Sequence, residues 1–205
     1  KNIIFTKSAT EGINLVSSCL SDNYFNDGDE VIIPAPYWVS YPEMVGLSGG
    51  KSVVINTDID SDFKIKPEDI EKAITTNTKA FLFNSPSNPT GSVYTYEELS
   101  EIAKVLVKYP DILIIADEIY EYITFDSEHH SLGSFPELKD QLVIVNGVSK
   151  GMAMTGWRVG WIIGSDEVIN IAKKIQSHAT SNVANLSQIA ATSALKNGLD
   201  ETNKM

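Results

Sequence analysis

A lysine that follows an apolar run is the side chain in this sequence best suited to covalent chemistry. Residues 142–145 predict a buried strand, and Ser149 and Lys150 come soon after it. Arg158 lies eight residues beyond Lys150 and carries a planar guanidinium suited to a phosphate. Most lysines are solvated surface amines, but residues 152–157 offer methionine, alanine and tryptophan side chains. We therefore expect Lys150 in a mostly apolar pocket, where loss of water favours its neutral, nucleophilic form.

Polar or aromatic side chains follow four further apolar runs. The runs cover residues 2–5, 31–34, 80–84 and 111–116, and they lead to Ser8, Trp38, Asn88 and Asp117, respectively. The carboxyl ends of parallel strands meet at one edge of a sheet, so we expect these side chains to gather with Lys150 there. A carboxylate directly after a buried strand is costly unless it is paired, and a helix cap or an internal ion pair is the alternative interpretation of Asp117.

Helical patterns alternate with the apolar runs. Ser8 and Glu11 fit a capping box, with the Ser8 hydroxyl at the cap and Glu11 reaching back, and the free N–H groups of such a helix start suit a phosphate. An ordinary strand–helix junction is the alternative. Other helices are predicted at 67–74, 96–107, after Ser165 and at 182–196, with further strands at 51–56 and 161–164 and a turn at 26–30. This order predicts an α/β fold, a three-layer, mostly parallel sheet with helices on both faces, in one domain over residues 1–205.

Composition narrows the classes of partner. The chain has 205 residues, with 16 Lys+Arg against 27 Asp+Glu and a formal net charge of −11, which argues against nucleic-acid binding. The single cysteine, Cys19, cannot form an internal disulfide, and we expect it to be a buried small hydrophobe in a reducing compartment. No apolar stretch approaches the roughly 20 residues that a membrane span needs, and no secretory signal is evident at the start. We therefore expect a cytoplasmic protein without a membrane partner.

No metal site is predicted. Residues 58–62 look like the opening of a calcium loop, but Phe63 stands where glycine is needed and Pro67 interrupts the loop, so we interpret them as a solvated acidic turn. His129 and His130 lie in a polar stretch. With three histidines in the chain and no cysteine near them, they do not make a zinc site.

The segment from Gly147 to Lys150, followed after seven residues by Arg158-Val159-Gly160, resembles the cofactor-lysine signature of the class I aminotransferases, which are fold-type I pyridoxal-phosphate enzymes. The resemblance extends over essentially the whole chain and implies pyridoxal 5'-phosphate as cofactor. Lys150 would hold the cofactor as a Schiff base and then serve as general base. Asp117 would face the ring nitrogen, and Trp38 would stack on the ring, with Tyr37 as the alternative.

The resemblance also assigns the remaining contacts. Asn88, in an Asn-Pro-Thr-Gly turn, and Tyr120 would contact the phenolic oxygen of the cofactor. The phosphate would be anchored by Ser8, Ala9, Thr10, Ser149 and Arg158. The implied catalytic residues are Lys150, Asp117 and Tyr120. Many members have glycine at the position of Ser8, and some have serine at the position of Gly147.

The implied reaction is transamination between an L-amino acid and 2-oxoglutarate. Residues 36–44 and 153–157 are most similar to the bacterial aspartate aminotransferase branch, so aspartate is the first choice of substrate. The alternatives are prephenate or aromatic amino acids as substrates, a pyridoxal-phosphate-dependent β-lyase, or a cofactor-sensing domain of a transcription regulator. In the family a smaller C-terminal part, an N-terminal segment and the partner subunit complete the substrate pocket. We therefore expect the large cofactor domain of a longer, homodimeric protein that acts on small amino and 2-oxo acids.

Overall fold

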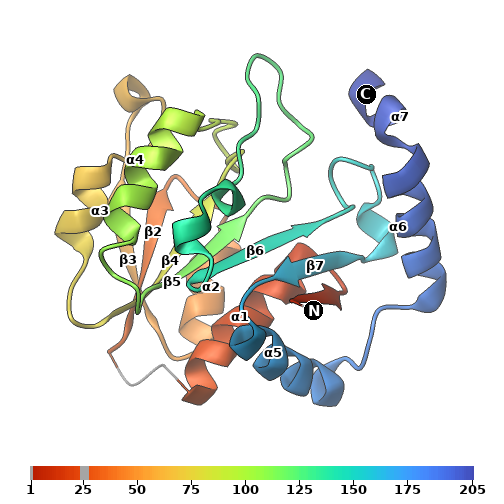
Figure 1. Cartoon of the computed structure of the whole chain (residues 1–205), viewed down its shortest axis with the longest axis horizontal. Helices are drawn as coiled ribbons and strands as arrows, with labels where there is room; N and C mark the ends of the chain where they lie inside the picture. Colours follow the sequence, from red (N-terminus) through yellow and green to blue (C-terminus); the bar gives the residue numbers. More distant parts are fainter. Residues whose placement is uncertain (1, 24–27) are drawn as a thin grey trace.

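The computed structural model describes residues 2–23 and 28–205, without the side chains of residues 19–23. Within these residues it contains a seven-stranded sheet in the order β1-β7-β6-β5-β4-β2-β3 (Figure 1). The strands are β1 (Ile3–Thr6), β2 (Glu30–Ala35), β3 (Lys51–Asn56), β4 (Thr78–Asn84), β5 (Leu113–Asp117), β6 (Leu142–Gly147) and β7 (Gly160–Ile163). Only β7 runs antiparallel to its neighbours, β1 and β6, so the other six strands share one direction.

Helices cover both faces of this sheet. They are α1 (Ala9–Asn23), α2 (Ser40–Leu47), α3 (Pro67–Ala73), α4 (Tyr96–Leu106), α5 (Asp166–Ala179), α6 (Asn185–Asn197) and α7 (Leu199–Lys204). Helices α1, α2 and α5 pack on one face, and α3 and α4 pack on the other. Helices α6 and α7 lie together at the side of the sheet (Figure 1). The predicted three-layer, mostly parallel α/β fold is confirmed.

The alternation of side chains along each strand produces two separate cores. In β2, Val31 and Ile33 join the core under α1, α2 and α5, whereas Ile32 joins the core under α3 and α4. In β4, Leu82 and Phe83 divide in the same way. Burial on both faces explains why these strands are continuous apolar runs in the sequence.

The start of α1 differs from the predicted capping box in one half. The Ser8 Oγ accepts a hydrogen bond from the backbone N–H of Glu11 at 3.1 Å, as expected. The Glu11 carboxylate, however, accepts from the N–H of Lys7 instead of Ser8, and it also accepts from the Thr180 hydroxyl at 2.6 Å. Glu11 therefore links the helix start to the end of α5 as well as capping it.

Two prolines account for other differences. The strand predicted to stop at Pro34 continues to Ala35, because Pro34 lies beyond the last register pair between β2 and β4, Ile32 with Phe81, where a missing N–H is tolerated. Helix α2 was not predicted, since Pro42 and the aromatic residues before it indicated a loop. Pro42 stands in the first turn of α2, where a backbone N–H has no intrahelical acceptor.

The C-terminal part of the chain forms two helices where one was predicted. The helix predicted at 182–196 begins at Asn185, and α7 follows it as a separate, unpredicted helix. Residues 58–62 form a largely exposed turn that contains a short 3-10 helix, Ile59–Ser61. The side chain of Cys19 and residues 26 and 27 of the predicted turn lie outside the described residues. Among the described helices, none combines the length and the apolar character that crossing a bilayer requires.

Candidate active site

A cavity of about 250 Å³ lies at the carboxyl ends of the parallel strands. It is lined by side chains that follow β1, β2, β4, β5 and β6, and it contains every residue assigned above to a cofactor contact. These are Ser8, Ala9, Thr10, Trp38, Asn88, Asp117, Tyr120, Ser149, Lys150 and Arg158. The predicted convergence of five strand ends is therefore what the fold produces.

The N-terminus of α1 forms one wall of the cavity. Thr6 Oγ1 donates to the Ser8 carbonyl at 2.8 Å, and the Gly12 N–H donates to the same carbonyl at 3.0 Å. The N–H groups of Ala9 and Thr10 precede the first intrahelical bond, so they are available to an anion. A Cβ on Gly160 would lie 2.6 Å from the Ser8 carbonyl carbon and 2.8 Å from the Ala9 nitrogen. Glycine at this position allows β7 to pass directly beside the helix start.

Asp117 is the buried charge of the cavity, with 4% of its surface exposed. Its Oδ2 accepts a hydrogen bond from the Tyr41 hydroxyl at 2.7 Å, and its Oδ1 accepts from the Ile119 N–H at 3.2 Å. Burial raises the pKa of Asp117 to about 6, although both hydrogen bonds and the charge of Lys150 act in the opposite direction. Neither a helix cap nor a close ion pair explains this carboxylate, because it caps no described helix and makes no ion pair within 4.0 Å in the described chain.

The turn that carries Asn88 is tied to the strand that carries Asp117. The Asn84 side chain accepts from the Asn88 N–H at 2.7 Å and donates to the Asp117 carbonyl at 2.8 Å. Tyr120 follows on the same segment, and the Lys150 Nζ lies 5.5 Å from the centre of its ring. These contacts tie the turn of Asn88 to the end of β5, and Asn88, Asp117 and Tyr120 all line the cavity.

The expected burial of Lys150 among its sequence neighbours is wrong. Lys150 is exposed, and Met152 and Met154 pack instead against a small cluster beside α6 that includes Val148 and Val159. Trp157 is 48% exposed and does not line the cavity. Sequence neighbours point to different sides of a tight, irregular segment, so their apolar character does not describe the environment of the amine.

The segment after Lys150 adopts two left-handed backbone conformations at residues other than glycine. Ala153 has φ 51° and Arg158 has φ 55°, and such conformations are concentrated at functional sites. Arg158 Nη1 donates to the Thr155 carbonyl at 2.7 Å, which orients the guanidinium at the cavity. A Cβ on Gly147 would lie 2.8 Å from the Val159 carbonyl oxygen, so a serine would not fit here without a shift of the backbone.

His129 lies in a loop, as its polar neighbours indicated, but its side chain is turned away from solvent. Its side chain is only 11% exposed, and its Nε2 lies 3.5 Å from Glu118 Oε2. The other oxygen of Glu118 accepts from the Ser131 hydroxyl and from the Leu132 N–H. Among the described residues, no three histidine, cysteine, aspartate or glutamate side chains are grouped in a way that could hold a metal ion.

Tyr41 is the site residue that sequence reasoning missed. It lies in the first turn of α2, a helix that the sequence did not predict, and no pattern in the sequence marks it. Ile119 and Thr155 also line the cavity without having been predicted. With a helix N-terminus, two cations and one buried carboxylate, the cavity suits a small molecule that carries an anionic group and a basic ring nitrogen.

Comparisons with known proteins agree with this arrangement. The family model described as aminotransferase class I and II matches residues 1–205. An aspartate/prephenate aminotransferase of Nitrosomonas europaea is 50% identical over 190 residues, which are 88% of this chain and 48% of that protein. The chain thus spans about half the length of this curated relative.

Solved structures show the same relationship. The aspartate aminotransferase of Rhizobium meliloti superposes with a TM-score of 0.92 at 36% identity, over 99% of this chain and 51% of that one. An aromatic aminotransferase of Pyrococcus horikoshii gives 0.91 at 35% identity, over 99% and 55% of the two chains. The family model matches all 205 residues of this chain, and the relatives are similar over most of it. We conclude that the chain belongs to the class I and II aminotransferase family.

Proposed function

We propose that the protein is a pyridoxal-phosphate-dependent transaminase that moves an amino group between an L-amino acid and a 2-oxo acid. The observation that carries this proposal is a single cavity that combines an amine, Lys150, with a buried carboxylate, Asp117, and an anion-binding helix start. Pyridoxal phosphate requires an amine that binds it covalently and a carboxylate that pairs with its ring nitrogen.

The residues of this chain would hold the cofactor in a defined way. Ser8, Ala9, Thr10, Ser149 and Arg158 would bind the phosphate, because they supply the free N–H groups of α1, three hydroxyls and a guanidinium. Trp38 would lie against the ring, with Asn88 and Tyr120 at its phenolic oxygen. When bound, pyridoxal phosphate supplies an electron sink and a carrier for the amino group.

The proton chemistry falls to Lys150 and Asp117. Once the substrate has displaced Lys150 from the cofactor, the Lys150 Nζ would take the α-proton of the substrate and transfer it to the cofactor carbon that carries the amino group. Asp117 would hold a proton on the ring nitrogen through a charge-assisted hydrogen bond, which keeps the ring positively charged. Tyr120 would donate its hydroxyl to the phenolic oxygen.

Aspartate and 2-oxoglutarate are the proposed substrates. The names of the relatives, which include aspartate, prephenate and aromatic aminotransferases, support an amino-acid substrate with a carboxylate or aromatic side chain. Product analysis with each candidate donor tests this choice. A new amino acid plus a 2-oxo acid supports transamination, whereas ammonia plus pyruvate from a cysteine conjugate would indicate a β-lyase.

We also propose that these residues form the large domain of a longer, homodimeric protein in the cytoplasm. The outer side of α6 supports an interface, because Leu186 is 77% and Ile189 is 59% exposed. The single cysteine in the chain fits a reducing compartment. Analytical ultracentrifugation of the full-length protein tests the dimer, and a monomer at micromolar concentration would contradict it.

Replacement of Lys150 tests the proposed reaction. Lys150→Ala in the full-length protein is expected to lose turnover, while cofactor still binds through its non-covalent contacts. Lys173→Ala, an exposed lysine of α5, is the matched control and is expected to keep full activity. Transaminase activity of Lys150→Ala close to that of the control would refute the assignment.

A further inference from the structure

We propose that Tyr41 is a positioning residue that keeps Asp117 ionised and aimed at the ring nitrogen of the cofactor. This inference rests on the proposed function, because it needs a ring nitrogen opposite Asp117. Tyr41 lies in the first turn of α2, and it comes 76 residues before its partner in the sequence.

Tyr41 is almost completely buried, so its hydroxyl depends on a partner in the protein. The side chain is 2% exposed and packs among apolar residues of the core beneath α1, α2 and α5. Its bond to Asp117 Oδ2, at 2.7 Å, satisfies the one polar group on the ring. Burial and the neighbouring charge of Asp117 raise the pKa of Tyr41 well above its usual value, so the hydroxyl keeps its proton and is always the donor.

This donation decides which form of Asp117 is stable. The carboxylate is buried, so without donors it would take up a proton and become neutral. Tyr41 and the Ile119 N–H each occupy a lone pair on a different oxygen, which fixes the carboxylate plane and favours the charged form. A neutral Asp117 could not form a charge-assisted bond to a protonated ring nitrogen.

Tyr41 also connects the carboxylate to the aromatic wall of the cavity. Its ring meets that of Trp38 edge to face, with centroids 5.5 Å apart and an interplanar angle of 90°. The Tyr41 N–H donates to the Trp38 carbonyl at 3.0 Å. Tyr41 therefore contacts both Trp38, which is proposed to stack on the cofactor ring, and Asp117, which is proposed to face its nitrogen.

The test compares two ligands and two isosteric variants of the full-length apoprotein. The ligands are pyridoxal phosphate and its analogue with carbon in place of the ring nitrogen. Tyr41→Phe removes the hydroxyl and keeps the ring. Tyr94→Phe is the matched control, because Tyr94 is equally buried, at 3%, and its hydroxyl also makes a 2.7 Å bond, but with the Ile65 N–H, and it does not line the cavity.

We expect Tyr41→Phe to weaken pyridoxal phosphate roughly tenfold, the lower range for a hydrogen bond to a charged group. In the apoprotein of this variant, Asp117 can take up a proton and so avoid an unpaired buried charge. In the complex it must stay ionised to pair with the charged ring, so the variant destabilises the bound state more than the free state. The carbon analogue leaves Asp117 without a cationic partner, so its affinity should change less than about twofold. Tyr94→Phe should leave both affinities unchanged, and thermal unfolding verifies that each variant is folded.

Three results would overturn the role of Tyr41. They are an unchanged affinity for pyridoxal phosphate in Tyr41→Phe, an equal loss for both ligands, or a further loss when Tyr41→Phe is added to Asp117→Asn. Wild-type protein that binds the two ligands equally well would also overturn it, since Asp117 would then not contact the nitrogen. Wild-type protein that binds neither ligand would refute the proposed function itself.

Discussion

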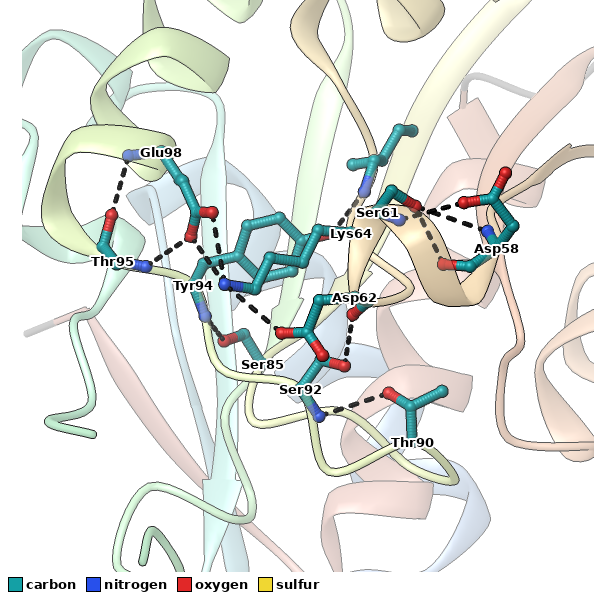
Figure 2. A network of polar contacts seen from close by, with 11 residues as sticks. Asp58, Ser61, Asp62, Lys64, Ser85, Thr90, Ser92, Tyr94, Thr95 and Glu98 are labelled. Carbon is teal, nitrogen blue, oxygen red and sulfur yellow. Dashed lines mark hydrogen bonds and ion pairs between the residues drawn. The ribbon is translucent and has the colours of Figure 1, made fainter. Parts of the chain in front are cut away.

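Two polar regions of this molecule differ in whether their charged side chains find partners within the chain. The network in Figure 2 joins the turn at 58–65 to the start of α4, and each of its charged side chains has a hydrogen-bond or ion-pair partner in the chain. Lys64 lies between Glu98 at 3.0 Å and Asp62 at 3.5 Å, above the ring of Tyr94. Glu98 in turn closes a capping box with Thr95.

The cavity at the strand ends leaves its charges unmatched. Lys150 and Arg158 make no ion pair with any other residue in the described part of the chain, and Asp117 is held by a hydroxyl and a backbone amide instead of a cation. Its backbone is also strained at Ala153 and Arg158. Charged side chains with partners in the chain stabilise the fold. Charged side chains without a close ion-pair partner in a cavity indicate a ligand-binding site.

Asp117→Asn gives the largest contrast between the two regions. The amide keeps the shape of the side chain but cannot stabilise a charged ring, so turnover of the full-length enzyme should fall roughly 10²–10³-fold. Glu98→Gln makes the same chemical change in the network of Figure 2 and should leave kcat unchanged. Steady-state kinetics of both variants measure this difference in kcat. A comparable loss in Glu98→Gln would contradict the proposal that only the cavity acts in catalysis.

The pH dependence of apoprotein stability sharpens the contrast. The folded state raises the pKa of Asp117 from 3.8 to about 6, so it keeps a proton that the unfolded chain releases. The stabilisation from this group is complete below pH 3.8 and is lost as the pH rises to about 6. At 1.36 kcal/mol per pH unit, the loss is at most about 3 kcal/mol.

Denaturant unfolding of the apoprotein at a series of pH values checks this prediction. Asp117→Asn should lack the loss and be more stable than wild type above pH 6. Parallel curves for the two proteins between pH 4 and 7 would show that Asp117 is not the buried acid described here.

Gly160→Ala probes the close approach that forms the anion-binding wall. The added Cβ meets backbone atoms of Ser8 and Ala9, so we expect about 1–3 kcal/mol lower unfolding free energy and weaker cofactor binding. Gly46→Ala is the control, because nothing lies within 4 Å of its Cβ in α2, and it should be neutral or stabilising by up to about 1 kcal/mol. Equal stability of the two variants would contradict the close contact.

Lys64→Met gives the smallest effect. Its partners Glu98 and Asp62 are 41% and 71% exposed, so the loss of both ion pairs should cost about 1 kcal/mol or less. Cofactor affinity should not change. Lys72→Met, which removes a pair with Asp69 whose lysine is 75% exposed, against 17% for Lys64, provides the reference for a negligible effect. Weaker cofactor binding in Lys64→Met would mean that the network and the cavity are coupled.

The sequence predicts the cavity well because its walls follow apolar runs. Residues 80–84 and 111–116 predict buried strands, Asn88 lies in the turn after the first and Asp117 directly follows the second, so chain direction brings them together. Tyr41 could not be found in this way, since the bond to Asp117 joins residues 76 positions apart and no pattern marks it. The exposure of Lys150 was mispredicted for a similar reason, because Met152 and Met154 pack on α6 contacts that local composition does not reveal.

Borohydride reduction of the full-length protein with pyridoxal phosphate, followed by peptide mass mapping, shows which lysine binds the cofactor. We expect one cofactor adduct, on Lys150, which disappears in Lys150→Ala and persists in Lys173→Ala. An adduct on another lysine, or no adduct in protein that binds the cofactor, would contradict this expectation.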